Sequence, residues 1–300
     1  MEFGKLATVD GIAFSLPPDH PNNAKLSAPA RPTRWFVGCP IWACKNWVGQ
    51  YYPSSAKEKD FLKHYAKQFN TIELNSTHYH LPDASTVARW RDSVPSGFTF
   101  CPKVLQSISH DSMLRNTEKL TEHFCYTLQG LDEHLGVCFL QLPSYFSPQH
   151  AAFLEAYIAA WPKDVALSVE FRNEAWFKPS ITAEETFAML AERNIGLVIT
   201  DVAGRRDVLH QRATNTTAAI RFVGNAPHPS DYTRLDEWAR KLKSWSSLHS
   251  DTVYFWVHEP DNIASPAFVS YFIEALQKLE IASNLQIPKK IFEPTQGFLF

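Results

Sequence analysis

The segment ALSVEFR, residues 166–172, shows the pattern that decides the fold. It is a short, nearly continuous apolar run that ends in a carboxylate, an aromatic ring and a guanidinium. Such a run is typical of a strand buried on both faces, as strands are in a parallel sheet. In parallel barrels the active site lies at the carboxyl ends of the strands, so the polar end of this run also predicts where the chemistry takes place.

Seven further runs have the same character and alternate with segments of helical period, which is the signature of repeated βα units. The predicted strands cover residues 35–39, 71–75, 98–103, 137–142, 166–171, 197–201, 218–223 and 252–258. We therefore predict an α/β protein with a (β/α)8 TIM-barrel fold. The rival, a doubly wound open sheet, usually needs a glycine-rich first turn, and the 11 glycines here form no G-x-G-x-x-G or P-loop spacing.

Helix boundaries are predicted from capping residues. Ser55 and Glu58 have capping-box spacing before an apolar stripe, and Ser265 followed by Pro266 predicts the N-cap and first turn of the last helix.

Residues 202–217 lack an apolar stripe, so we predict a loop there. The first 33 residues are rich in proline and predict an extension lying on the barrel. The predicted organisation is an extension over residues 1–33, a barrel over 34–280 and a tail over 281–300.

Composition excludes several classes of protein. Three hundred residues suit one barrel of ~250 residues with extensions. The 29 basic and 31 acidic residues give a net charge of −2, so no global field attracts nucleic acid or an anionic membrane. The five cysteines are scattered and predict reduced core thiols. No apolar run approaches the ~20 residues that span a bilayer, and the start lacks the features of a secretion signal, so we expect a cytoplasmic protein.

Polar side chains gather at the downstream ends of the predicted strands, where a barrel would bring them together. They are Glu73, Asn75, Lys103, Gln141, Glu170, Arg172, Asp201, Arg221 and His258. Charged groups in a partly desolvated cleft must satisfy one another or a ligand, and their pKa values shift. We predict a functional site; the alternative is an internal ion-pair network, such as Glu170 with Arg221, that only closes the barrel mouth.

The residue types suggest roles within this site. Glu73, Glu170, Asp201 and Lys103 are the candidate catalytic residues: the carboxylates would move protons, and a desolvated Lys103 could be a base or a Schiff-base nucleophile. Arg172 and Arg221 would form a clamp for an anion, to which Lys103 could add a point charge. Metal binding by Glu73, Glu170, Asp201 and His258 is a less favoured reading because neighbouring arginine and lysine repel cations, and no cofactor is indicated.

Aromatic residues and histidines follow several strands. Trp42, Tyr79 and Trp176 are candidate substrate-binding residues because aromatic walls suit stacking on a sugar or a base. His110 is a candidate proton shuttle at the same mouth. The alternative is that the aromatic residues cap the barrel and pack the extension.

The chain carries a series of motifs in order between residues 35 and 279. They are Gly38-Cys-Pro-Ile-Trp42, Glu73-Leu-Asn-Ser-Thr77, Leu140-Gln-Leu-Pro143, Glu170-Phe-Arg172, Asp201 and Arg221. In these motifs the sequence resembles the YecE-like family, known as domain of unknown function 72. The resemblance implies a TIM barrel and nominates Glu73, Lys103, Glu170, Arg172 and Asp201, but it names no substrate. The chain departs from the family pattern at Asn173, at Gly224-Asn225 and at the run that begins His258-Glu259.

Three functions remain open at this point. The leading hypothesis is a hydrolase or isomerase that acts on a small anionic or polyhydroxylated substrate by acid–base chemistry. The second is a nucleic-acid or nucleotide binder in which aromatic loops stack bases. The third is a catalytically silent barrel used for protein interaction.

Overall fold

The computed structural model describes residue 4 and residues 6–291, and eight parallel strands form its centre. The strands are β1 (Arg34–Cys39), β2 (Thr71–Leu74), β3 (Thr99–Pro102), β4 (Cys138–Gln141), β5 (Leu167–Glu170), β6 (Gly196–Asp201), β7 (Thr217–Val223) and β8 (Thr252–His258). Their order in the sheet is β3-β2-β1-β8-β7-β6-β5-β4. Every observed strand end lies within one residue of the predicted end, so the predicted (β/α)8 barrel is confirmed.

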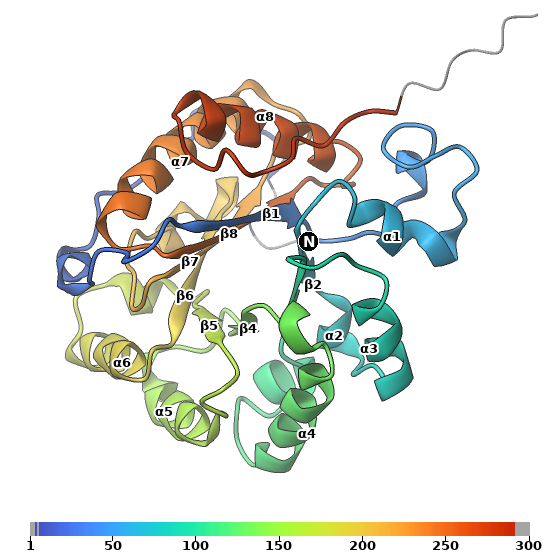
Figure 1. Ribbon diagram of the computed structural model, residues 1–300. Coiled ribbons are helices and arrows are strands. Elements are labelled where there is room, and N and C mark those ends of the chain that lie inside the picture. Colours follow the sequence, from blue (N-terminus) through green and yellow to red (C-terminus); the bar gives the residue numbers. More distant parts are fainter. Residues whose placement is uncertain (1–3, 5, 292–300) are drawn as a thin grey trace, which may run out of the picture.

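The sheet closes on itself between β3 and β4, which carry the two free edges. The Gly136 amide donates to the Phe100 carbonyl at 2.8 Å, and the Val104 amide donates to the Phe139 carbonyl at 3.0 Å. These bonds, together with the ladders of the other strands, make a nearly closed ring (Figure 1).

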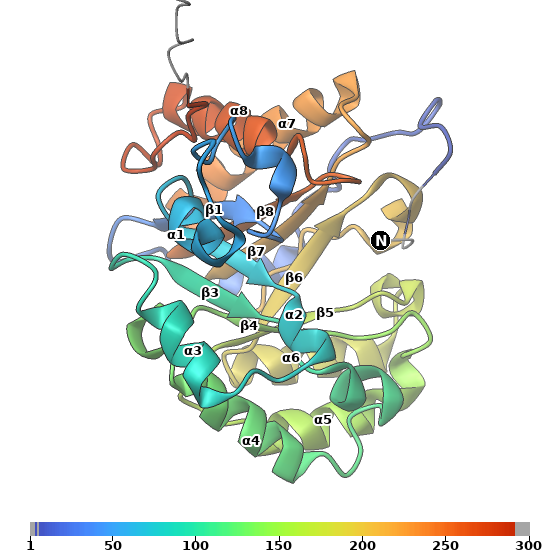
Figure 2. The ribbon, with the colours of Figure 1, turned by 90° about the vertical axis from the view of Figure 1, so that its right-hand side faces the viewer.

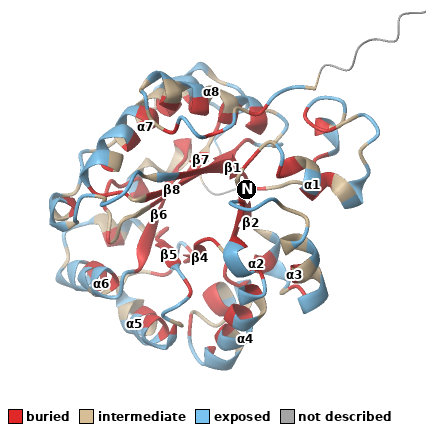
Figure 3. Ribbon diagram, in the orientation of Figure 1, coloured by how far each residue is buried: buried red, intermediate tan, exposed pale blue. Residues whose placement is uncertain are grey.

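Helices surround the ring on its outer side (Figure 1). They are α1 (Phe61–Tyr65), α2 (Ser76–Tyr79), α3 (Ala84–Arg91), α4 (Glu118–Gln129), α5 (Ala151–Ala160), α6 (Ile181–Glu192), α7 (Pro229–Leu248) and α8 (Ser265–Lys278). The strands are buried and the outer helix faces are exposed (Figure 3). Between β6 and β7 the described chain forms only a 3-10 turn, Ala203–Val208, and no α-helix, which agrees with the predicted loop.

Two predicted helix caps are wrong. A 3-10 turn, Glu58–Asp60, precedes α1 and places Asp60 at the N-cap, so the exposed Ser55 caps nothing. Ser265 is the first residue of α8 and Ala264 is its N-cap. The Ser265 hydroxyl donates to the side chain of Asn262, and no side chain of the described residues accepts a capping hydrogen bond at the start of α8.

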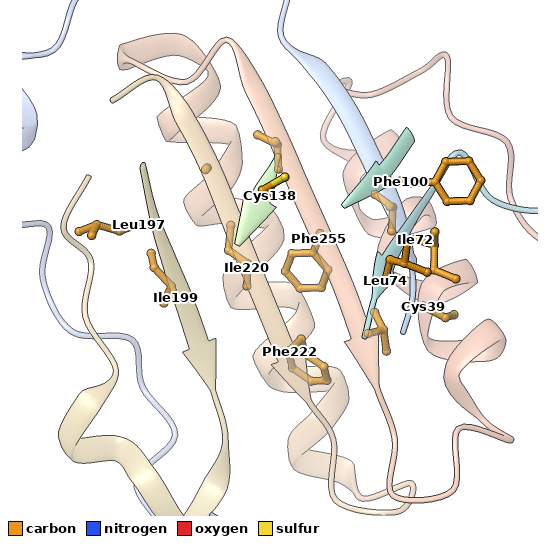
Figure 4. Close-up of a cluster of buried hydrophobic side chains, with 14 of the residues drawn as sticks. Cys39, Ile72, Leu74, Phe100, Cys138, Leu197, Ile199, Ile220, Phe222 and Phe255 are labelled. Carbon is orange, nitrogen blue, oxygen red and sulfur yellow. The ribbon is translucent and has the colours of Figure 1, made fainter. Parts of the chain in front are cut away.

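Alternate residues of each strand point to opposite sides of the barrel wall, so the core has two parts. The larger part lies between strands and helices and includes Ile72, Ile220 and Phe255 (Figure 4). The smaller part fills the barrel interior, where the Phe139 and Trp256 rings lie 6.1 Å apart. Side chains thus pack the interior, and the carboxyl ends of the strands are the place for a polar site.

The amino-terminal extension packs against the β6–β7 loop and α7. The Asn23 side chain donates to the Gln211 carbonyl at 2.8 Å, and Trp245 Nε1 donates to Asp19 at 2.9 Å. The Phe14 ring lies under the guanidinium groups of Arg206 and Arg234, 5.5 and 5.1 Å from their central carbons. The first described residues lie on the side toward which the strands point (Figure 2), and the extension then follows α7 to the amino end of β1.

In the described part of the chain, no helix is both long and apolar enough to cross a membrane. The predicted tail extends to residue 300, and its residues 292–300 lie outside the described residues.

Candidate functional site

Polar side chains from six strands meet inside the carboxyl end of the barrel. We call them the mouth network, and its members are Glu73 and Asn75 from β2 and its end, Lys103 after β3, Gln141 of β4, Glu170 and Arg172 from β5 and its end, Arg221 of β7 and His258 of β8. All except Asn75, which is partly exposed, are buried. The sequence predicted that the side chains at these strand ends lie close together, and these eight residues do so.

Arg221 joins the two carboxylates of the network. Its Nε and Nη2 donate to the two oxygens of Glu73 at 3.0 and 2.9 Å, and its Nη1 donates to Glu170 Oε2 at 3.1 Å. The side chain is completely buried. Burial alone would raise the pKa of Glu73 and of Glu170, but the neighbouring cations outweigh it, so the pKa of Glu73 falls well below its usual range and that of Glu170 falls to about 2. Both glutamates are therefore ionised at neutral pH.

Further hydrogen bonds extend the network across the mouth. Arg172 Nε donates to Glu170 Oε1 at 2.7 Å, and Gln141 Nε2 donates to Glu170 Oε2 at 2.7 Å. Lys103 Nζ in turn donates to Gln141 Oε1 at 2.7 Å. On the other side, Asn75 Nδ2 donates to Glu73 Oε1 at 2.8 Å. A continuous chain of bonds thus runs from Lys103 to the β2 side of the barrel.

Burial lowers the pKa of Lys103 to about 7, with Arg221 and Arg172 adding to the effect and the glutamates opposing it in part. A neutral amine is therefore well populated at neutral pH. The neutral amine is the protonation state in which a lysine can act as a base or a nucleophile.

His258 is paired with Glu73, since its Nε2 lies 2.6 Å from Glu73 Oε2. The carboxylate is ionised and accepts, so Nε2 carries the hydrogen and Nδ1 carries the lone pair. Burial lowers the pKa of His258, although Glu73 opposes this shift. The result is a neutral imidazole held in one tautomer by a carboxylate, the arrangement that orients a general base.

A cavity of about 730 Å³ opens beside His258. Its polar lining consists of Thr8, Asp10, Asn75, Asn225, His228, His258, Glu259 and Asn262. Residue 4 and residues 6–10 of the extension form one wall, and Pro40, Ile41 and Val223 form part of the opposite walls. No lysine or arginine of the described chain lines it. We call this space the mouth cavity.

Glu259 lines the mouth cavity and was not among the site residues predicted from the sequence. Its Oε2 accepts from the Ala226 amide at 3.2 Å, and its buried Oε1 has no hydrogen-bond partner among the described residues. Burial and the nearby Asp231 raise the pKa of Glu259 to about 8. The carboxyl packs on Gly224, where an added Cβ would lie 1.8 Å from Oε1. Gly224 and Glu259 both belong to the segments that the sequence-based resemblance singled out as departures, and this was the signal that could have identified Glu259.

Asp201 does not join the mouth network. Its neighbour Thr200 points to the barrel interior, so Asp201 points outward, toward α7. There it accepts from Trp238 Nε1 at 2.8 Å and pairs with Arg234 and Arg206. The four ligands of the metal reading, Glu73, Glu170, Asp201 and His258, are therefore not brought together.

The predicted aromatic residues also lie away from the mouth cavity. Trp42 packs edge-on against Trp90, and Trp176 is buried, with its Nε1 donating to the Phe146 carbonyl at 2.7 Å. Tyr79 is 77% exposed on the surface. Trp42 and Trp176 therefore serve as packing residues at the barrel end, which is the alternative to a substrate-binding role. His110 is half-buried with its ring 5.1 Å from that of His78, near Lys103.

Fold and site together define a barrel protein with a buried charge network and a neighbouring cavity at the carboxyl ends of its strands. The family model described as "Protein of unknown function DUF72" matches residues 36–290, and the chain belongs to this family. The UPF0759 protein YecE of Escherichia coli K12 is 29% identical over 275 residues, which cover 85% of this chain and 98% of YecE. YunF of Bacillus subtilis is 24% identical over 169 residues, 52% of this chain and 57% of YunF.

Solved structures of the family share the fold. A DUF72 protein of Enterococcus faecalis V583 has a TM-score of 0.66 at 18% identity and covers 82% of this chain and 98% of its own. A DUF72 protein of Thermotoga maritima has a TM-score of 0.64 at 22% identity and covers 82% of this chain and 99% of its own.

Proposed function

We propose that this protein is an enzyme of the hydrolase or isomerase class that acts by acid–base chemistry on a small polyhydroxylated substrate in the mouth cavity. One observation carries the proposal: His258, oriented by Glu73 at 2.6 Å, and the proton-carrying Glu259 line the same cavity. A base and an acid whose environments hold them in opposite protonation states are what such catalysis needs.

The proposed roles differ from those that residue types alone suggest. Glu73 and Glu170 have lowered pKa values and would stay ionised, so Glu73 orients the imidazole and does not itself move a proton. His258 Nδ1 would accept a proton from a substrate hydroxyl or C–H group. Glu259, with its pKa near 8, would donate one to an oxygen of the substrate. Asn75, Asn225 and Asn262 supply neutral groups that suit hydroxyl recognition.

Negative charge on the substrate would be held at the other side of the mouth. Arg221 is completely buried between the two carboxylates, so we assign the anion-binding role to Arg172, which follows the end of β5. A substrate with a hydroxylated body and an anionic end therefore fits the two sides of the mouth better than a long polymer does. Trp176 is buried and Trp42 packs edge-on against Trp90, which argues against a base-stacking surface, so we favour a small molecule over nucleic acid.

The test is a screen of aldoses, ketoses, sugar phosphates and simple glycosides, followed by NMR for isomerisation, hydrolysis or deuterium uptake next to a carbonyl. We expect turnover that falls about 100-fold or more in His258→Gln and in Glu259→Gln, the usual range for removing a general acid or base. His123→Gln and Glu122→Gln, at exposed positions of α4, are matched controls. Full activity in both cavity variants would contradict the proposal.

We also propose a cytoplasmic location. All five cysteines are buried and free, which fits a reducing compartment.

A further inference from the structure

Lys103 is held differently from the other cations of the mouth network. The two carboxylates are occupied by Arg221 and Arg172, whereas Lys103 Nζ bonds to the amide oxygen of Gln141 at 2.7 Å. No ion pair involves Lys103 among the described residues. A neutral amide stabilises an ammonium less than a carboxylate does, so this amine can lose its proton while the network stays intact.

The groups that surround Lys103 explain its protonation. Burial contributes most to lowering its pKa, Arg221 and Arg172 repel the ammonium, and Glu170 and Glu73 attract it less strongly; the pKa becomes about 7. The charge of Lys103 also shifts the pKa values of two histidines. Burial and Lys103 lower the pKa of His78 to about 4 and lower that of His110 as well, so both imidazoles are neutral at pH 7.

The two histidines lie close enough to Lys103 for its charge to affect their pKa values, and they also contact each other. His78 Nδ1 lies 2.7 Å from the Val104 carbonyl, which can only accept, so Nδ1 carries the hydrogen and Nε2 carries a lone pair. The His110 ring lies 5.1 Å from the His78 ring and is only half-buried. A buried amine is thus accompanied by a neutral proton acceptor and by a second imidazole that reaches toward the surface.

We propose that Lys103 is a nucleophile that forms a Schiff base with the carbonyl carbon of a polyhydroxylated aldehyde or ketone. This inference rests on the proposed function, because it names the carbonyl as the reactive group of the same substrate class. The neutral amine adds to the carbonyl carbon, the C=O π electrons move to oxygen, and a proton passes from nitrogen to that oxygen through His78. The carbinolamine then loses water: nitrogen gives up its remaining proton, the C–O bond breaks and a C=N bond forms.

The test is reductive trapping in the full-length protein. Glycolaldehyde, glyceraldehyde or dihydroxyacetone is added with sodium cyanoborohydride, which delivers hydride to the imine carbon and leaves a stable secondary amine. Peptide mass mapping then locates the modified lysines between pH 5.5 and 9. We expect Lys103 to be modified with a half-maximal rate near pH 7, whereas a lysine in a model peptide, with a pKa of about 10.4, requires more alkaline conditions.

Two variants sharpen the result. Lys103→Met should remove this modification and leave the others unchanged. Arg172→Gln removes a repelling cation, so the pH of half-maximal modification should rise by about one unit while Lys103 stays the modified residue. An unmodified Lys103, or modification only in proportion to exposure, would overturn the Schiff base. An unmodified Lys103 in a protein that turns over substrate and depends on His258 would overturn this inference alone and leave the proposed function standing.

Discussion

Arg221 is the residue on which the mouth network depends, because its guanidinium is the shared partner of Glu73 and Glu170. Arg221→Met would leave two buried carboxylates with much less compensation. We expect the free energy of unfolding at pH 7 to fall by about 3–5 kcal/mol, measured by urea denaturation, as is usual when one partner of a buried ion pair is removed. A loss below about 1 kcal/mol would contradict the central place of Arg221.

The same variant should reverse the pH dependence of stability. In the wild type the pKa of Glu170 is about 2 in the folded state and near 4.3 in the unfolded state. The ionised carboxylate therefore contributes fully to the stability of the fold above pH 4.3, and this contribution is lost as pH falls toward 2. Without Arg221 the folded pKa of the carboxylates rises. If it passes the unfolded value, as we expect, Arg221→Met will be more stable at pH 4 than at pH 7.

Glu259 makes the opposite contribution. The pKa of Glu259 is about 8 in the folded state and near 4.3 in the unfolded state. The contribution of Glu259 to stability is therefore fully present below pH 4.3 and declines as pH rises through 8. Glu259→Gln removes this decline. We expect the variant to gain about 2–4 kcal/mol relative to wild type at pH 8 and almost nothing at pH 4. Equal effects at the two pH values would show that Glu259 does not titrate in this way.

The residue scale also shows what the sequence could not reveal. Glu73, Glu170 and Arg221 were predicted as neighbours because each lies near a strand end, and in the structure all three point inward. Asp201 is also a charged residue at a strand end, but it lies one position beyond the inward-facing Thr200. A shift of one residue reverses the side of the wall, and an apolar run that is buried on both faces does not show which side is inward.

At the scale of elements, the strands were predicted closely and the helix starts less so. A strand buried on both faces is recognised from its continuous apolar run, whereas a helix start depends on which side chain accepts the first free amide. At α8 that residue is not Ser265, whose hydroxyl donates to Asn262. The mouth cavity could not be predicted either, because its walls come from segments far apart in sequence, such as residues 6–10 and 223–226.

Asp201 attaches α7 to the barrel wall through Arg234 and Trp238. Asp201→Asn keeps the shape but removes the charge opposite two arginines. We expect the free energy of unfolding to fall by about 2–4 kcal/mol in urea denaturation, from the loss of buried charged hydrogen bonds. Asp92→Asn, at an exposed pair with Arg91, is the control and should stay within about 0.5 kcal/mol. Similar values for the two variants would mean that Asp201 is not an anchor.

At the scale of the whole molecule, the extension and the barrel form one cavity. The family match begins at residue 36, so the wall made by residue 4 and residues 6–10 lies outside the matched region. Helices α7 and α8 lie on one side of the barrel and α3, α4 and α5 on the other (Figure 2), and the early chain reaches the face between them at the strand ends. The barrel thus supplies the mouth network, and the extension supplies one wall of the cavity beside it.

Deletion of residues 1–12 should therefore open the mouth cavity without unfolding the barrel, because Phe14, Asp19 and Asn23 would keep their contacts. Diethylpyrocarbonate modifies accessible neutral imidazoles, and peptide mapping gives a rate for each histidine. We expect His258 to react several-fold faster in the shortened chain, since the wall in front of it is gone. His134 is equally buried, at 6% exposure for each residue, but it precedes β4 at the opposite end of the barrel, so its rate should not change. An unchanged rate at His258 would show that the extension does not cover the site, and equal acceleration at both histidines would indicate general loosening of the barrel.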